Sequence, residues 1–370
     1  MSDNLTYSQS GVNYNLLDEL KRMAQSAAKQ THNVSRNDGL HIKEETIGES
    51  ACVVESDLGK ANYAFVQEGL GTKNLVADEM EKLIGKSYYD AIAQDTVAMI
   101  INDLITVGAS PLLVTAYWAI GSTKWLENRK RMEDLTAGWS KACIDSGAFW
   151  GGGETPILSG IINENTIDLA GSAFGVIKPK ERLIVGNKLQ AGDAIVVFES
   201  SGIHANGITL ARKIAEQLPD GYATKLPSGK MYGEALLTPT TIYAKLVNEL
   251  LDSHVDIHYM ANITGHGWRK LMRNSKPFSY RITSLPPVSE IFTFIQEKGP
   301  VTEEEMYGNF NMGAGFAIFA SKNSVGTIFK SSAQHNIKSY EIGIVETGEK
   351  RVIIEPKNIE YKADSLQVKA

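Results

Sequence analysis

The chain of 370 residues carries a formal net charge of −6 and is 43% hydrophobic and 22% charged, which is the composition of an ordinary globular protein. Its length predicts two domains. The acidic balance excludes the basic surface typical of nucleic-acid-binding proteins, the apolar runs are shorter than the ~18 residues of a membrane span, and two cysteines cannot build a disulfide framework. No basic segment followed by an apolar one marks a secretory signal. We therefore expect a cytoplasmic protein whose partners include neither nucleic acid nor a membrane.

Hydrophobic periodicity predicts helices and strands in both halves of the chain. The first helix is predicted over 15–31, with Asn15 as its N-cap and an apolar face at helical spacing: Leu16, Leu17, Leu20, Met23, Ala24 and Ala27. The other predicted elements of the first half are a strand at 61–69, helices at 94–109 and 125–148, and a strand at 167–177. Those of the second half are strands at 193–200, 316–321, 339–346 and 351–356, and helices at 208–218 and 240–252. The pattern lapses between 178 and 189, so we place the boundary there and predict domains 1–178 and 179–370 of mixed α/β content.

The helix QDTVAMIINDLITVGA (94–109) carries polar side chains within an apolar stretch. Because successive helical residues are about 100° apart, Asp95, Met99, Asn102 and Thr106 share one stripe. The opposite face is apolar and has the spacing of a core-packed helix. The stripe either faces water or lines a cleft; the absence of lysine and glutamate, which are usual on a surface helix, favours a cleft that holds a cation.

Three glycine-rich stretches are candidates for binding phosphate or metal: QEGLGTK (67–73), GGGETPILSG (151–160) and SSGIHANG (200–207). Glycines let the backbone approach a ligand, and each stretch adds polar side chains. Singly each is also typical of a structural turn. A P-loop is excluded because Met80 stands where its first glycine is required, and no strand is followed by GxGxxG.

Taken in order, these stretches resemble the phosphoribosylformylglycinamidine cyclo-ligase (aminoimidazole ribonucleotide synthetase) family. The chain reads EGLGTK, AQDTVAMIINDLITVGASP, GGGETPILSG, SSGIHANGITLARK, ITGHG and FNMGAGFAI. Family members typically show DGVGTK, D-x-x-AM-x-x-ND followed by GA-x-P, GGET, SSG-x-H-x-NG, ITGGG and FNMG-x-G. The resemblance extends from GVNYN at Gly11 to RVIIEP at Pro356, nearly the whole chain.

The resemblance implies a two-domain α/β fold whose N-terminal mixed sheets pair in a homodimer. It also implies ATP-driven cyclisation of formylglycinamidine ribonucleotide to aminoimidazole ribonucleotide in purine biosynthesis, with Mg²⁺ as a cofactor. The formyl amide oxygen takes the γ-phosphoryl group, and a substrate nitrogen then displaces phosphate. In such chemistry the protein chiefly positions groups and offsets charge.

Site residues are carried over motif by motif. The implied catalytic residues are Lys73, Asp95 and His204, where Lys73 meets phosphate as a point charge and His204 moves a proton. The implied metal ligands are Glu68, Asp95, Asp103 and Glu154, whose carboxylates suit Mg²⁺. The implied ATP and phosphate contacts are Gly69, Gly71, Thr72, Lys73, Asn102, Gly152, Gly153, Ser201, Gly202, Asn206 and Gly265.

The chain departs from the family pattern at four places. Gln67 and Glu68 replace threonine and aspartate, SRNDGLHIKEETIGES replaces a glycine-rich GGF-type loop, and Asn262 and His266 replace histidine and glycine. Glu68 keeps the charge but moves it outward by about one methylene, and a side chain at His266 narrows what that backbone approaches. These changes indicate either a divergent branch with the same activity or a related enzyme with another substrate.

Other members of the superfamily are the first alternative. Selenophosphate synthetases use a reactive cysteine or selenocysteine in a glycine-rich loop, where this chain has none; the hydrogenase maturation factor uses a C-terminal cysteine, whereas this chain ends SLQVKA; and formylglycinamidine synthetase is much longer. Thiamine-phosphate kinase stays open, although SSGIHANG and FNMGAG favour the cyclo-ligase. The second alternative is a non-catalytic nucleotide-binding paralogue, which loss of the metal carboxylates would have indicated; Asp95, Asp103 and Glu154 are all present.

Overall fold

The structure is a computed structural model that describes residues 14–31 and 39–366. Gly11–Asn13 of the GVNYN segment and residues 35–38 of the segment that replaces the GGF-type loop lie outside the described residues, as does the side chain of Leu16. Within the described ranges no helix is long and apolar enough to cross a membrane.

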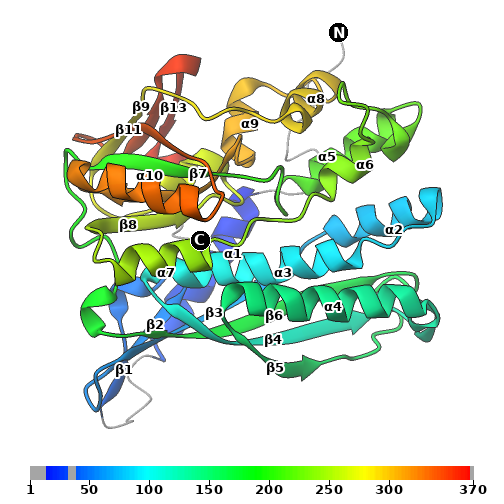
Figure 1. Cartoon of the computed structure of the whole chain (residues 1–370), viewed down its shortest axis with the longest axis horizontal. Helices are drawn as coiled ribbons and strands as arrows, with labels where there is room; N and C mark the ends of the chain where they lie inside the picture. The colour runs from blue at the N-terminus through cyan, green and yellow to red at the C-terminus, as the bar shows by residue number, and fades with distance from the viewer. Residues whose placement is uncertain (1–13, 32–38, 367–370) are drawn as a thin grey trace.

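The described elements form two domains of mixed helix and strand (Figure 1). The helices are α1 (Tyr14–Lys29), α2 (Lys73–Ile84), α3 (Tyr89–Leu104), α4 (Arg129–Ser146), α5 (Ile208–Gln217), α6 (Tyr232–Leu236), α7 (Ala244–Asp252), α8 (Glu290–Lys298), α9 (Glu303–Asn309) and α10 (Val325–Gln334). The strands are β1 (Leu40–Ile42), β2 (Cys52–Ser56), β3 (Asn62–Gly69), β4 (Ser110–Ile120), β5 (Phe149–Glu154), β6 (Ile167–Ile177), β7 (Ala194–Glu199), β8 (Ile257–Asn262), β9 (Phe278–Ile282), β10 (Ala314–Ala320), β11 (Ser339–Thr347), β12 (Arg351–Ile354) and β13 (Ile359–Lys362).

The first sheet has the order β1-β2-β3-β6-β4-β5 and is antiparallel except for the parallel pair β4–β5. Its alternating strands direct residues such as Ala64 and Val66 into a core covered by α3 and α4, whereas Phe65 points to the other face. Figure 1 shows both helices on the side of the sheet that faces the second domain. The polar ends of β3 and α3 are thereby turned toward the second half of the chain.

The second sheet has the order β13-β12-β9-β11-β7-β10-β8, again mixed because only β9 and β12 pair in parallel. Its central strands β7 and β10 are buried almost throughout and read as continuous apolar runs. Helix α7 packs against α10 of its own domain and α4 of the first. The predicted mixed α/β fold is confirmed.

Most predicted elements are present, and four differ in ways that have physical causes. The helix predicted over 94–109 is α3, which begins five residues earlier at Tyr89 and ends at Leu104, because a short 3₁₀ turn follows and closes at Gly108 with a positive φ of 80°. The helix predicted over 125–148 begins at Arg129, because the Asn128 side chain accepts from Arg131 N and caps it there. The helix predicted from 240 begins at Ala244, because the preceding backbone is bound to side chains of α3. Asn15 is not the N-cap of α1, which already begins at Tyr14.

Candidate functional site

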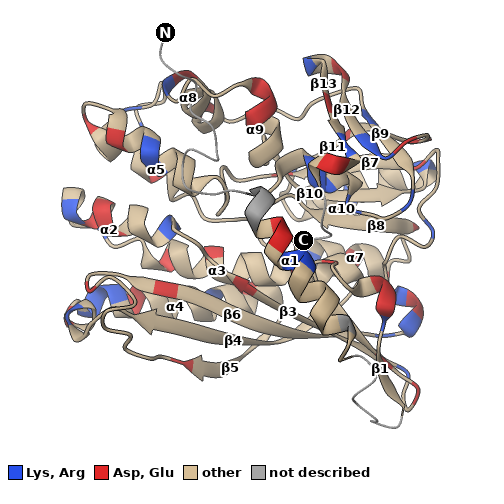
Figure 2. Ribbon diagram, turned by 180° about the vertical axis from the view of Figure 1, so that it is seen from behind, with Lys and Arg blue, Asp and Glu red and all other residues tan. Residues whose placement is uncertain are grey.

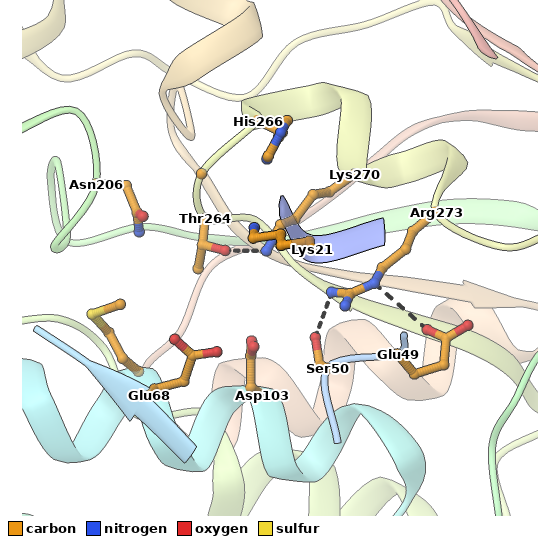
Figure 3. Close-up of a pocket in the computed structure, with 12 residues that line it drawn as sticks. Lys21, Glu49, Ser50, Glu68, Asp103, Asn206, Thr264, His266, Lys270 and Arg273 are labelled. Carbon is orange, nitrogen blue, oxygen red and sulfur yellow. Dashed lines mark hydrogen bonds and ion pairs between the residues drawn. The ribbon is translucent and has the colours of Figure 1, made fainter. Parts of the chain in front are cut away.

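A cavity of about 400 Å³ lies between the domains, where the end of β3 and helix α3 face the loops after β8 (Figure 3). Both halves of the chain contribute to it. Its lining residues are Lys21, Glu49, Ser50, Glu68, Met99, Asp103, Asn206, Thr264, Gly265, His266, Lys270 and Arg273. Four of the predicted site residues, Glu68, Asp103, Asn206 and Gly265, therefore meet in one pocket.

One wall of the cavity is acidic. Glu68 comes from the inward-facing row of β3, and Asp103 from α3. Burial, reinforced by the neighbouring Asp103 carboxylate, raises the pKa of Glu68 to about 7. Asn262 Nδ2 donates to Asp103 Oδ1 at 2.7 Å and orients that carboxylate. A divalent cation bound between Glu68 and Asp103 would relieve the effect of the Asp103 carboxylate on Glu68, and Mg²⁺ beside phosphate and water is usually held by one or two carboxylates.

The opposite wall is basic and carries residues that sequence reasoning missed. Lys270 Nζ donates to Thr264 Oγ1, and burial lowers the pKa of Lys270 to about 8. Arg273 Nη1 donates to Ser50 Oγ at 2.6 Å, and its Nε lies 3.7 Å from Glu49 Oε2. Lys270 and Arg273 stand three residues apart in WRKLMRN, directly after the ITGHG motif, and this helical spacing was the signal that would have found them.

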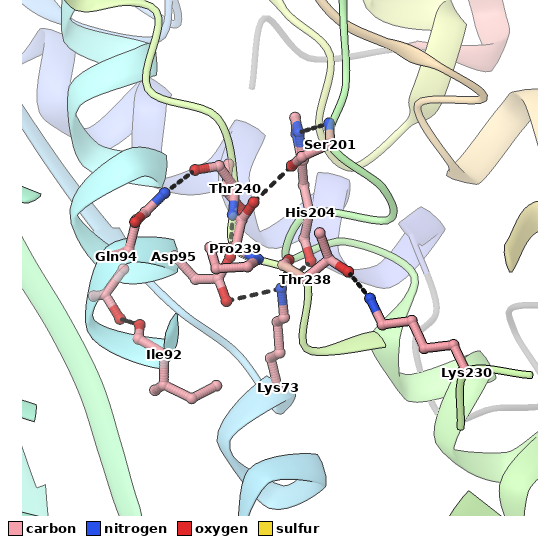
Figure 4. Close-up of polar contacts among 11 residues, drawn as sticks. Lys73, Ile92, Gln94, Asp95, Ser201, His204, Lys230, Thr238, Pro239 and Thr240 are labelled. Atoms are coloured by element: carbon pink, nitrogen blue, oxygen red, sulfur yellow. Dashed lines mark hydrogen bonds and ion pairs between the residues drawn. The ribbon is translucent and has the colours of Figure 1, made fainter. Parts of the chain in front are cut away.

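A second polar cluster, whose central residues Lys73 and Asp95 are fully buried, joins the domains beside the cavity (Figure 4). Lys73 Nζ lies 2.7 Å from Asp95 Oδ2 and donates to the carbonyls of His204 at 2.8 Å and Thr238 at 3.0 Å. Asp95 Oδ1 accepts from the backbone N–H of Thr240 at 2.8 Å. Burial lowers the pKa of Lys73 and raises that of Asp95, and the attraction between them opposes both shifts. All three ammonium protons of Lys73 have partners, so this cluster is an interdomain clasp in the conformation described.

The polar stripe of α3 extends this clasp. Asn102 Nδ2 donates to Thr241 O at 2.8 Å, and its Oδ1 accepts from Tyr243 N at 3.0 Å. Met99, between Asp95 and Asn102, lines the cavity. The stripe does not face water; it holds the backbone of 240–243, and only its middle reaches the cleft.

His204 lies inside the SSGIHANG turn with its imidazole fully enclosed. Ser201 N donates to His204 Nε2 at 3.3 Å, and burial together with Lys73 lowers the pKa of His204 to about 3. The ring is therefore neutral near pH 7. Ser201 and Gly202 belong to the same turn, in which Gly202 O accepts from Asn311 Nδ2.

The GGGET stretch lies on β5, at the sheet edge remote from β3. The register aligns Glu68 with Gly171, Gly171 with Ala116 and Ala116 with Gly153. Three strand spacings of about 4.8 Å each put Gly152, Gly153 and Glu154 about 14 Å from Glu68 along the sheet. In the described part of the chain no group of three or more acidic, histidine or cysteine side chains is arranged to hold a metal. Of the four predicted metal ligands the fold brings only Glu68 and Asp103 together.

The first glycine-rich stretch forms the turn between β3 and α2. Gly69 ends the strand, Gly71 takes a positive φ of 78°, and Thr72 is the residue before the helix. A positive φ is the conformation for which glycine is favoured. His266 also has a positive φ, 68°, although it carries a side chain.

Comparisons with known proteins agree with this architecture. The family models "AIR synthase related protein, N-terminal domain" and "AIR synthase related protein, C-terminal domain" match residues 48–177 and 190–355. Among solved structures, AaThiL complexed with AMPPCP and TMP superposes with a TM-score of 0.61 at 17% identity, covering 98% of both chains. A HypE–HypF complex superposes with a TM-score of 0.59 at 15% identity, covering 85% of this chain and 93% of that one. The fold is that of the two-domain AIR synthase related proteins.

Curated relatives narrow the assignment. A phosphoribosylformylglycinamidine cyclo-ligase of Carboxydothermus hydrogenoformans is 35% identical over 358 residues, which is 95% of this chain and 99% of that protein. One of Pyrococcus furiosus is 36% identical over 342 residues, 92% and 95% of the two chains. The chain belongs to the phosphoribosylformylglycinamidine cyclo-ligase family, as its motifs predicted.

Proposed function

We propose that this chain is a ligase that converts formylglycinamidine ribonucleotide to 5-aminoimidazole ribonucleotide at the expense of ATP, releasing ADP and phosphate in purine biosynthesis. Membership of the cyclo-ligase family over nearly the whole chain is the observation that carries the proposal. A pocket with an acidic and a basic wall supports it, because both substrates are phosphorylated and one phosphoryl group must be transferred.

The residues of the cavity fit a Mg²⁺–nucleotide complex. Glu68 and Asp103 would hold Mg²⁺, which neutralises charge on the phosphates of ATP when it is bound. Asn206 and Gly265 face the same space and are proposed to contact the nucleotide, together with Ser201 and Gly202 of the adjoining turn. Phosphorylation of the formyl amide oxygen makes it a good leaving group, and its displacement by the substrate nitrogen then requires alignment rather than a protein nucleophile.

The remaining predicted site residues keep their predicted roles as proposals. Lys73 and Asp95 hold each other in the clasp, and a role at the phosphates requires the clasp to rearrange when ATP binds. Gly69, Gly71 and Thr72 precede Lys73 and would approach the nucleotide by the same movement. Asn102 would contact the nucleotide together with these residues. His204 can carry a proton only if its ring reaches the cavity.

Gly152 and Gly153 keep their proposed role as phosphate contacts, and Glu154 keeps its proposed role as a metal ligand. All three lie on β5, far along the sheet from Glu68. We also propose the domain division 1–178 and 179–370, for which the strand gap between Ile177 and Ala194 is the support. The predicted cytoplasmic location stays a proposal that rests on the metabolic role.

The uncovered face of the first sheet supports a homodimer. Phe65, Tyr117 and Phe149 are exposed there, and in the described part of the chain no helix covers that side (Figure 1). A contiguous apolar sheet face is typical of an interface. Sedimentation velocity should give a dimer that Phe149→Asp converts to a monomer, whereas Leu83→Asp on α2 should remain dimeric; a monomeric wild-type protein would overturn the proposal.

The activity is tested by following ADP release with Mg²⁺ and ATP, with and without formylglycinamidine ribonucleotide, while diazo coupling measures the aminoimidazole product. Substrate-dependent ADP release matched by aminoimidazole is the expected result. ADP release without that product would indicate a related enzyme with another substrate. ATP binding without any turnover would indicate a non-catalytic paralogue.

A further inference from the structure

Helix α1 is turned the opposite way from what its sequence predicts. Its apolar residues are exposed, with fractional exposures of 42% for Leu17 and 64% for both Leu20 and Met23. Asp18, on the polar face, is only 6% exposed. An amphipathic helix ordinarily buries its apolar stripe. Here the polar face is the one that packs against the protein.

The polar partners are residues at the rim of the cavity. Asp18 Oδ2 lies 3.6 Å from Nε2 of His266, the fourth residue of the ITGHG stretch. Burial and the neighbouring cations, Arg269 first among them, lower the pKa of His266 to about 2, so the contact joins a carboxylate to a neutral ring. Burial raises the pKa of the Asp18 carboxyl, and the nearby Lys21, Arg22 and Arg269 oppose that rise. The side chain at 266 thus gives α1 a surface to dock on.

Docking of α1 brings Lys21 into the cavity. Lys21 lies one helical turn after Asp18, on the same face of the helix. It lines the cavity together with Lys270 and Arg273, opposite Glu68 and Asp103 (Figure 3). Figure 2 shows α1 lying across the front of the molecule between α3 and the second domain. Three cations from two domains thereby face one space.

We propose that α1 covers the cavity and that Lys21, together with Lys270 and Arg273, binds the phosphate monoester of the substrate, with Asp18 and His266 as the pair that positions the helix. A phosphate monoester carries close to two negative charges and three acceptor oxygens, and lysine and arginine are its ordinary ligands. The carboxylate wall repels such a group and is suited to a metal-bound nucleotide instead. The two walls therefore separate the phosphate of the substrate from the phosphates of ATP.

The identity of the phosphorylated ligand rests on the proposed function, but the phosphate site can be tested without turnover. Isothermal titration with ribose 5-phosphate and with ribose, in a phosphate-free buffer, isolates the contribution of the phosphate. Lys21→Met should lower the affinity for ribose 5-phosphate about tenfold, which corresponds to the loss of one charge-assisted hydrogen bond, and should leave the affinity for ribose unchanged. Lys130→Met removes a lysine from the exposed face of α4 and is the charge-matched control. Equal affinity of Lys21→Met and the wild-type protein for ribose 5-phosphate, or no preference of the wild-type protein over ribose, would overturn the phosphate site.

The positioning pair is tested by coupling. His266→Gly relaxes the backbone at a positive φ and should fold, yet it removes the surface on which Asp18 docks. We expect His266→Gly to weaken the binding of ribose 5-phosphate about as much as Lys21→Met does. The double variant should bind this ligand at most about twofold more weakly than either single variant, because Lys21 is already displaced when the His266 side chain is absent. Met23→Ala, on the exposed side of α1, should have no effect. Losses that multiply in the double variant would refute the positioning role.

The same variants separate this inference from the proposed activity. If ribose 5-phosphate binding depends on Lys21 but no aminoimidazole forms, the site binds a phosphate monoester and the proposed reaction is wrong. If aminoimidazole forms and the KM for formylglycinamidine ribonucleotide is the same in Lys21→Met and the wild-type protein, the reaction stands and the phosphate site is wrong. A higher KM for that substrate with an unchanged KM for ATP supports both.

Discussion

Removal of the Asp95 side chain tests whether its main role is to stabilise the interdomain clasp with Lys73 or to bind a metal ion. Asp95→Ala leaves the Lys73 ammonium buried without its counter-ion, 2.7 Å from where the carboxylate was, and leaves Thr240 N without its acceptor. Breaking one side of a buried ion pair costs about 3–5 kcal/mol, and a lost backbone hydrogen bond adds about 1 kcal/mol. The free energy of unfolding should therefore fall by about 4–6 kcal/mol.

Urea unfolding followed by tryptophan fluorescence measures this loss. With a slope of about 3 kcal/mol per molar urea, the midpoint should fall by about 1.3–2 M. The double variant Lys73→Met with Asp95→Leu leaves no uncompensated charge and should recover roughly half of the loss or more. Glu133→Gln disrupts an exposed pair with Arg129 and should shift the free energy by less than about 1 kcal/mol.

A different result would show that Asp95 is a metal ligand in the working enzyme. If Asp95→Ala unfolds at the wild-type midpoint but loses Mg²⁺-dependent ATP turnover, the clasp contributes little stability and the carboxylate serves the nucleotide. An unchanged midpoint would contradict the stabilising role of the Lys73–Asp95 pair, because an isolated buried ammonium is expected to be costly.

Further predictions concern the acidic wall. Asp103→Asn should raise the Mg²⁺ concentration needed for half-maximal turnover by about tenfold or more, since a charged ligand becomes neutral; an unchanged requirement would exclude it as a ligand. Glu68 has a folded-state pKa of about 7, above its ordinary value, so the folded protein retains a proton that the unfolded chain has lost, and this residue's contribution to stability declines as pH rises from about 4.5 to 7. Added Mg²⁺ should reverse that decline, and Glu68→Gln should abolish both effects in pH-dependent thermal unfolding. Asn262→Ala should weaken Mg²⁺ binding by a few-fold through Asp103 without a change in the KM of the phosphorylated substrate; an altered KM would place Asn262 at the substrate instead.

Helices and strands could be predicted from the sequence wherever the periodicity of the side chains agreed with the requirements of the backbone. The strand predicted at 167–177 is β6, Ile167–Ile177, because its alternating pattern matches a sheet with one buried face. The spacing of Asp95 and Asn102 correctly placed them on one side of α3. What that side contacts, the backbone of 240–243, lies more than a hundred residues away in the chain, and no local pattern encodes such a partner.

The candidate site was likewise predicted only in part, because the motifs identify residues but not the distances between them. The motifs named Glu68, Asp103, Asn206 and Gly265, and the fold places these four residues around one cavity. The motifs also joined Glu154 to them, because a motif list carries no distance, and only the strand register shows the separation along the sheet.

The basic wall was missed for a related reason. Lys270 and Arg273 read locally as ordinary surface charges, and Lys21 reads as the solvent face of an amphipathic helix. Their convergence depends on α1 exposing its apolar stripe, which hydrophobic patterning alone argues against. A helix that reverses its expected orientation gives up burial of Leu20 and Met23, and side chains of that kind contribute about 1.5–3 kcal/mol each when buried. Contacts at Asp18 alone do not offset that loss, because burial outweighs the attraction of Lys21, Arg22 and Arg269 and raises the pKa of this carboxyl.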